Sequence, residues 1–165
     1  MSETLPKLIV FDLDYTLWPF WVDTHVTPPF RKSKDGNIID LYNAKIKCYP
    51  QVPQVLQKLH EQGYILGVAS RTGEINGAHQ LLNLFNWEEY FTYKEIYPGC
   101  KVTHFKRIHT KSGIDFKDMI FFDDEHRNVS DLNREGVVSI LVRDGVTEKV
   151  VSEGLAEFSK KRNGN

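Results

Sequence analysis

Cysteine is scarce in this chain: its 165 residues include only Cys48 and Cys100. Two cysteines cannot build the disulfide framework of a small secreted domain, so we expect a reducing compartment. The chain also lacks an apolar run near the roughly 20 residues that cross a bilayer, and it lacks the apolar core of a secretory signal. These absences predict a cytoplasmic protein with no membrane segment.

An excess of one charge sign is missing as well. The formal net charge is −1, and the basic residues are dispersed apart from Lys160-Lys161-Arg162 near the end. This balance gives no electrostatic reason to expect binding to nucleic acid or to a membrane surface. Because a chain of this length can bury a core without disulfides, we expect one domain over residues 1–165, and a monomer.

Short apolar runs alternate with helical patterns along the chain. The expected strands cover residues 8–11, 64–69, 91–97, 119–122 and 137–142, and the helical patterns lie at 52–63, 78–85, 102–113, up to about 134, and 151–158. This alternation, with short joints, predicts an α/β fold with a doubly wound, mainly parallel sheet. Residues 18–50 have no clean period, and we expect them to form an excursion that folds over the active site as a flap.

Two carboxylates follow the first apolar run directly. Strand geometry places Asp12 and Asp14 on the same side of the chain if it stays extended. Two like charges held together raise each other's pKa unless a cation lies between them. The pair therefore indicates a metal site or a proton-sharing acid/base pair, unless both residues only cap a turn.

Further polar residues follow the other expected strands. Ser70 and Arg71 come after the second strand, Lys101 after a later element, and Asp123-Asp124 after the 119–122 run. In a parallel sheet, ligands bind beyond the carboxyl ends of the strands, so we expect these groups to meet there. A cluster of carboxylates without thiolates or grouped histidines favours Mg²⁺.

This combination of groups matches the chemistry of phosphoryl transfer. A divalent cation and a lysine can neutralise the charge of a phosphoryl group. A carboxylate can attack phosphorus and form an aspartyl-phosphate, and a second carboxylate can protonate the leaving oxygen. Histidines are not needed for these steps, and we expect His104 and His109 to be polar helix residues, not ligands.

The ordered motifs resemble those of the haloacid dehalogenase-like (HAD-like) phosphohydrolase superfamily. They comprise residues 12–16, Ser70, Lys101 and 121–124, and the segments 11–21, 69–72, 95–105 and 121–128 more narrowly resemble the eukaryotic magnesium-dependent phosphatase family. The resemblance extends over nearly the whole chain and implies a HAD-like Rossmannoid fold. Only about thirty residues separate Ser70 from Lys101, so we expect no separate cap domain.

The resemblance implies a catalytic and metal-binding set at the acidic positions. Asp12 would be the nucleophile and would bind Mg²⁺ through its other oxygen. Asp14 would be the general acid/base and would lend its backbone carbonyl to the metal, while Thr16 would brace the loop. Asp123 and Asp124 would complete the metal shell, and the sequence leaves open which of them binds directly.

A second set would hold the substrate. Ser70 and Lys101 would bind the phosphoryl oxygens, and the backbone N–H of Leu13 would point at the phosphate. Arg71 is either a surface side chain at the start of a helix or a ligand-binding residue. In the second case its guanidinium would make a bidentate contact with the phosphate or with a substrate carboxylate. Trp21 is our candidate for an aromatic side chain on the substrate side.

The expected function is that of a Mg²⁺-dependent phosphatase of the acid or protein-tyrosine type. The resemblance implies phosphotyrosine proteins and/or phosphorylated sugars of the fructosamine-6-phosphate type as substrates. An uncapped site would admit either kind, and the residues themselves do not favour one of them. A cysteine-dependent phosphatase is excluded, since neither Cys48 nor Cys100 has an arginine six positions later.

Two other classes remain as alternatives. A receiver-like phosphoacceptor signalling module also combines acids, Mg²⁺, a hydroxyl and a lysine, but its acid doublet comes early in the chain and Asp14 would have no role in it. A phosphate-binding protein without catalysis would normally lack Asp12, Asp14 or Lys101, and all three are present.

Overall fold

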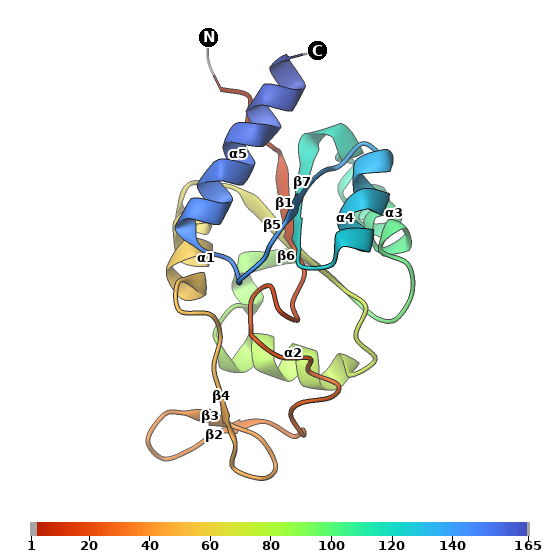
Figure 1. Ribbon diagram of the computed structural model, residues 1–165. Helices are drawn as coiled ribbons and strands as arrows, with labels where there is room; N and C mark the ends of the chain where they lie inside the picture. The colour runs from red at the N-terminus through yellow and green to blue at the C-terminus, as the bar shows by residue number, and fades with distance from the viewer. Residues whose placement is uncertain (1–2, 165) are drawn as a thin grey trace.

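Five parallel strands form the central sheet of the computed structural model, which describes residues 3–164 (Figure 1). The strand order is β6-β5-β1-β7-β8, and each neighbouring pair is parallel. The strands are β1 (Leu8–Phe11), β5 (Ile65–Ser70), β6 (Phe91–Ile96), β7 (Met119–Asp123) and β8 (Val138–Leu141). The predicted doubly wound parallel sheet is confirmed.

Helices cover both faces of this sheet. They are α1 (Val52–Glu61), α2 (Ile75–Leu84), α3 (Lys101–Ser112), α4 (His126–Arg134) and α5 (Glu148–Asn163), with short 3₁₀ helices η1 (Glu88–Tyr90) and η2 (Phe116–Asp118). Alternate β1 side chains face opposite sides: Ile9 and Phe11 pack with apolar residues of α1, α2 and α5, and Leu8 and Val10 pack with those of α3 and α4. No helix within residues 3–164 is long and apolar enough to cross a membrane.

The strand order reverses at β1, and this reversal positions the site. The chain runs from β1 to β5 and β6 on one side, then crosses to β7 and β8 on the other. Loops that leave β1, β5 and β7 therefore diverge at the carboxyl ends of the strands and leave a crevice between them. Between β5 and α3 the chain forms only α2, η1 and β6, so the described residues include no separate cap domain there.

The excursion forms a small antiparallel sheet of its own below the carboxyl edge in Figure 1. Its strands are β2 (Arg31–Lys32), β3 (Ile38–Ile39) and β4 (Lys45–Ile46). Buried Asp40 accepts hydrogen bonds from three backbone N–H groups and so shapes the turn before β4. The backbone N–H of Phe30 donates to Gln80 on α2, which attaches the excursion to the main fold. Closure of this segment over the site stays a prediction.

Candidate active site

The loop after β1 forms the floor of the candidate site. The carbonyl of Leu13 accepts hydrogen bonds from the N–H groups of Thr16 and Leu17, at 3.0 and 2.8 Å, and so closes a tight turn. Tyr15 adopts a positive φ of 56° to make this turn, which is uncommon for a residue other than glycine. Among residues 3–164, no acceptor hydrogen-bonds the Leu13 N–H, in keeping with its predicted role toward a ligand.

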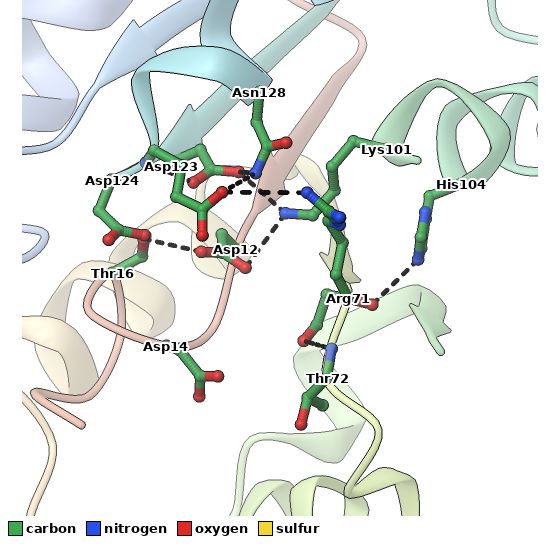
Figure 2. Close-up of polar contacts among 12 residues, drawn as sticks. Asp12, Asp14, Thr16, Arg71, Thr72, Lys101, His104, Asp123, Asp124 and Asn128 are labelled. Atoms are coloured by element: carbon green, nitrogen blue, oxygen red, sulfur yellow. Dashed lines mark hydrogen bonds and ion pairs between the residues drawn. The ribbon is translucent and has the colours of Figure 1, made fainter. Parts of the chain in front are cut away.

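Three carboxylates meet beside this turn, from the ends of β1 and β7 (Figure 2). One oxygen each from Asp12, Asp123 and Asp124 lies within 4.8 Å of the others. Burial, and next the charge of Asp123, raises the pKa of Asp12 well above its ordinary value. Burial likewise raises the pKa of Asp124 to about 6. This crowding of negative charge on oxygen donors fits a hard divalent cation.

Lys101, the first residue of α3, is buried against the same carboxylates. Its Nζ donates to Asp12 Oδ1 at 3.1 Å and to Asp123 Oδ2 at 2.8 Å (Figure 2), and it lies 5.0 Å from the centre of the Phe121 ring. Burial lowers the pKa of Lys101, but the two carboxylates raise it more, so the net shift is upward. Because one ammonium faces three carboxylates, it offsets only part of the negative charge of the cluster.

The two acids of the β1 loop have different surroundings. Asp14 lies apart from the three-carboxylate cluster, and its Oδ1 accepts hydrogen bonds from Trp18 Nε1 at 2.7 Å and from the Val22 N–H at 3.1 Å. Burial raises the pKa of Asp14 to about 6, against the lowering effect of these two donors. Both donors contact one oxygen, so the second oxygen is left for proton exchange.

Trp18 therefore links the core to the acid, and Trp18→Phe tests that link. The ring is fully buried and stacks on Phe20 at 5.5 Å, so phenylalanine keeps apolar packing but loses the N–H donor. If Asp14 is the general acid, as the sequence predicts, we expect turnover to fall about tenfold, because a misplaced acid loses part of its contribution. Steady-state kinetics measures this effect.

The matched control is Trp87→Phe, because Trp87 is buried beside Trp18 without a hydrogen bond to Asp14. Both changes remove the same volume, and we expect each to lower the free energy of unfolding by about 1–3 kcal/mol. Equal losses of turnover in the two variants would contradict a specific role for the Trp18 N–H.

A cavity of about 330 Å³ opens from this floor to the surface. The predicted residues that line it are Asp12, Asp14, Trp21, Ser70, Arg71, Lys101 and Asp124. Five further residues line it as well: Asp23, Thr24, Thr72, Glu125 and Asn128. The structure therefore gathers the predicted side chains at one place; Asp123 lies just behind them, fully buried.

Trp21 and Arg71 lie at the cavity mouth. Trp21 is 48% exposed and stacks on His25 at 5.2 Å, which leaves part of its ring open to the cavity. Arg71 Nη1 lies 4.0 Å from Glu125 Oε2, and both side chains are about half exposed. An exposed pair at this distance is weak, so the guanidinium can turn to an anionic ligand.

Hydrogen bonds from neighbouring residues hold the side chains at the base of the cavity in place. Ser70 is buried, and its Oγ accepts the N–H of Thr72 at 3.3 Å. Asn128 Nδ2 donates to Asp123 Oδ2 at 3.0 Å and to Glu125 Oε2 at 3.3 Å. The Thr16 hydroxyl lies 3.4 Å from Asp12 Oδ2 and 3.5 Å from Asp124 Oδ1, so it can bridge the loop to the end of β7.

Comparison with known proteins identifies the family. A model of the acid phosphatase family matches residues 4–161. The chain is 54% identical over 160 residues to magnesium-dependent phosphatase 1 of Homo sapiens, covering 97% of this chain and 91% of that protein. The chain belongs to the acid phosphatase family. It is also 49% identical over 143 residues to the HAD-like hydrolase superfamily protein P8B7.31 of Schizosaccharomyces pombe, covering 80% and 83% of the two chains.

The fold agrees with this assignment. The crystal structure of a predicted phosphatase from Clostridium acetobutylicum superposes with a TM-score of 0.65 at 18% identity, over 98% of this chain and all of that one. The resemblance to the HAD-like superfamily and to its magnesium-dependent phosphatases is therefore confirmed for this acid phosphatase family member.

The sequence signals for the residues that were not predicted are weak. Asp23 and Thr24 sit in an aperiodic segment, where no pattern indicates which side chains face the sheet edge. Glu125 directly follows Asp123-Asp124, and its position next to this acid doublet is the sequence signal that could have identified it.

Proposed function

We propose that this protein is a Mg²⁺-dependent phosphomonoester hydrolase that works through Asp12. The observation that carries the proposal is the position of the Asp12 carboxylate: it lies on the cavity floor, with Lys101 at one oxygen and the other acids close by. A nucleophile for phosphorus needs such a site, where nearby positive charge neutralises the phosphoryl group. Family membership supports this chemistry.

The carboxylate cluster is the proposed metal site, with the Asp14 backbone carbonyl as a further ligand. Bound Mg²⁺ would supply charge neutralisation at the phosphoryl oxygens. Both oxygens of Asp123 already accept protein hydrogen bonds, from Lys101 and Asn128 at Oδ2 and from the Glu125 N–H at Oδ1. We propose that Asp12, Asp123 and Asp124 together provide the carboxylate oxygens of this site, and that these hydrogen bonds orient Asp123 within it.

In the first half-reaction, an Asp12 oxygen attacks phosphorus, the ester P–O bond breaks, and Asp14 gives its proton to the leaving oxygen. Ser70, Lys101 and the Leu13 N–H hold the phosphoryl oxygens. In the second, Asp14 takes a proton from water, which attacks phosphorus and releases inorganic phosphate and Asp12. Asp14 lines the same cavity as Asp12, which favours this hydrolytic role over a receiver-like module that keeps its phosphate.

The proposed substrates are phosphotyrosine proteins and/or phosphorylated sugars of the fructosamine-6-phosphate type. The cavity is open at the sheet edge, and Trp21 and Arg71 lie where the group beyond the phosphate would sit. An aromatic ring can pack on either kind of leaving group, and a guanidinium can bind a substrate anion. We propose a monomeric cytoplasmic enzyme as the simplest setting for this activity.

Removal of the metal is the direct test of the proposed function. With an aryl phosphate as substrate, we expect phosphate release with Mg²⁺ to exceed release with a chelator by at least about 10²-fold, because several kcal/mol of charge stabilisation is lost. Added Mg²⁺ should restore the rate. No turnover with Mg²⁺ would favour a phosphate-binding protein without catalysis. A panel of phosphotyrosine peptides and sugar phosphates would then rank the substrates by kcat/KM.

A further inference from the structure

His104 is a buried histidine that the proposed chemistry does not use. It lies one turn after Lys101 on α3, its exposed fraction is 0%, and it is not among the residues that line the cavity. A fully buried imidazole needs partners for its polar nitrogens. The groups that contact its two ring nitrogens indicate the role of this side chain.

Both ring nitrogens of His104 face backbone carbonyl oxygens. Nε2 lies 2.7 Å from the Tyr97 oxygen and 2.9 Å from the Ser70 oxygen, and Nδ1 lies 3.0 Å from the Cys100 oxygen. Carbonyl oxygens accept and never donate, so the ring must be the donor. Two acceptors meet at Nε2, whereas the Cys100 oxygen already accepts the Thr103 N–H at 2.9 Å. The Nε2–H donor therefore makes the more important contact.

The contacts of Nε2 join two segments that are distant in sequence. Ser70 ends β5, and Tyr97 belongs to the loop that leads from β6 into Lys101 and α3. The Ser70 carbonyl also accepts the Tyr97 N–H at 3.0 Å, so a three-way junction forms at this point. Figure 2 shows the His104 ring reaching from α3 toward the segment that carries Arg71, directly after β5.

The ring itself is held firmly. Tyr97 stacks on it with centroids 4.3 Å apart and planes within 8°. The Tyr97 hydroxyl donates to buried Glu95 at 2.6 Å, and Glu95 also pairs with Lys111 Nζ at 2.6 Å. A stacked and anchored ring keeps Nε2 directed at the carbonyl oxygens of Ser70 and Tyr97, so the distance between these two segments stays fixed.

We propose that His104 is a positioning residue that sets the spacing between Ser70 and Lys101 through its Nε2–H donor. The inference rests on the proposed function, because Ser70 and Lys101 are there the groups that hold the phosphoryl oxygens. Displacement of one such group by about 1 Å can cost as much as 10²-fold in rate. Loss of the donor then weakens phosphate binding, while the carboxylates of β1 and β7 keep their positions.

The decisive test compares His104→Gln with His104→Asn. The glutamine amide N–H can take the place of Nε2–H, whereas asparagine is shorter and reaches only the region of Nδ1. We expect the asparagine variant to raise KM for an aryl phosphate and the inhibition constant of inorganic phosphate by about tenfold. The glutamine variant should stay within about threefold of wild type, and the Mg²⁺ concentration for half-maximal rate should change less than twofold in both.

The control is His109→Gln, on the exposed side of the same helix, and it should leave all three constants unchanged. Equal constants in the glutamine and asparagine variants, or parallel changes in the Mg²⁺ requirement, would overturn the proposal, since a general loss of stability acts on both. Hydrogen exchange gives a readout that does not depend on activity: faster exchange at residues 70–73 and 97–101 in His104→Asn alone supports the role. If wild type lacks phosphatase activity, the proposed function fails and this exchange pattern still tests the junction.

Discussion

Asp12→Asn is expected to lower kcat for an aryl phosphate by at least about 10⁴-fold. Asparagine has nearly the same shape, but its amide is a very poor nucleophile, so the proposed aspartyl-phosphate cannot form. The variant also removes one of the three clustered carboxylates. We therefore expect Mg²⁺ to raise the melting temperature less than it does in wild type, because stabilisation follows affinity.

Asp115→Asn is the matched control, since Asp115 is exposed before η2 and its side chain makes no capping hydrogen bond. It should keep wild-type kcat and the wild-type response to Mg²⁺. Turnover that survives in Asp12→Asn would place the nucleophile elsewhere. Trapping of radioactive phosphate on wild-type protein by rapid acid quench, and its absence in the variant, would complete the assignment.

Lys101→Met is expected to lower the free energy of unfolding of the metal-free protein by about 3–5 kcal/mol, because it leaves two buried carboxylates without their cation. The pKa of Lys101 is raised in the fold, so its stabilising contribution is fully present at pH 7 and is lost only as pH rises through that raised pKa. We also expect kcat/KM to fall by about 10²–10³-fold, since in the proposed mechanism this charge faces the phosphoryl group. Urea denaturation and steady-state kinetics measure the two effects.

Added Mg²⁺ should restore part of the lost stability in Lys101→Met, because it offsets the charge of Asp12 and Asp124. Lys106→Met on the exposed face of α3 is the control, and its stability should change by less than about 0.5 kcal/mol. A Lys101→Met variant as stable as wild type without metal would mean that the carboxylates are already neutral, and our account of their charge would be wrong.

The positions of the main site residues could be predicted because they follow from strand geometry. Asp12, Ser70 and Asp123 each end or directly follow an apolar run, and parallel strands bring their carboxyl ends to one edge. Lys101 is at the first position of a helix that begins at that same edge. A local pattern and one topological rule were therefore enough to bring these residues together.

The remaining parts of the site depend on side-chain direction, which no short pattern specifies. Trp18 is buried in the core, but the direction of its N–H toward Asp14 depends on the turn at Tyr15. His104 was predicted as a polar helix residue; it is on α3, yet the ring turns inward to carbonyls of two other segments. Such contacts arise from packing between elements, so the sequence alone does not indicate them.

The uncovered edge of the sheet bears on the fate of a phosphoryl group once it is on Asp12. Enzymes that pass such a group to a second organic molecule must shut out bulk solvent, because water competes as the acceptor. Here the stretch between β5 and α3 is used for α2, η1 and β6, and the described residues contain no domain that could seal the cavity from that side. In the proposed mechanism, an open cavity of this kind leaves the phosphoryl group on Asp12 accessible to water, which favours hydrolysis.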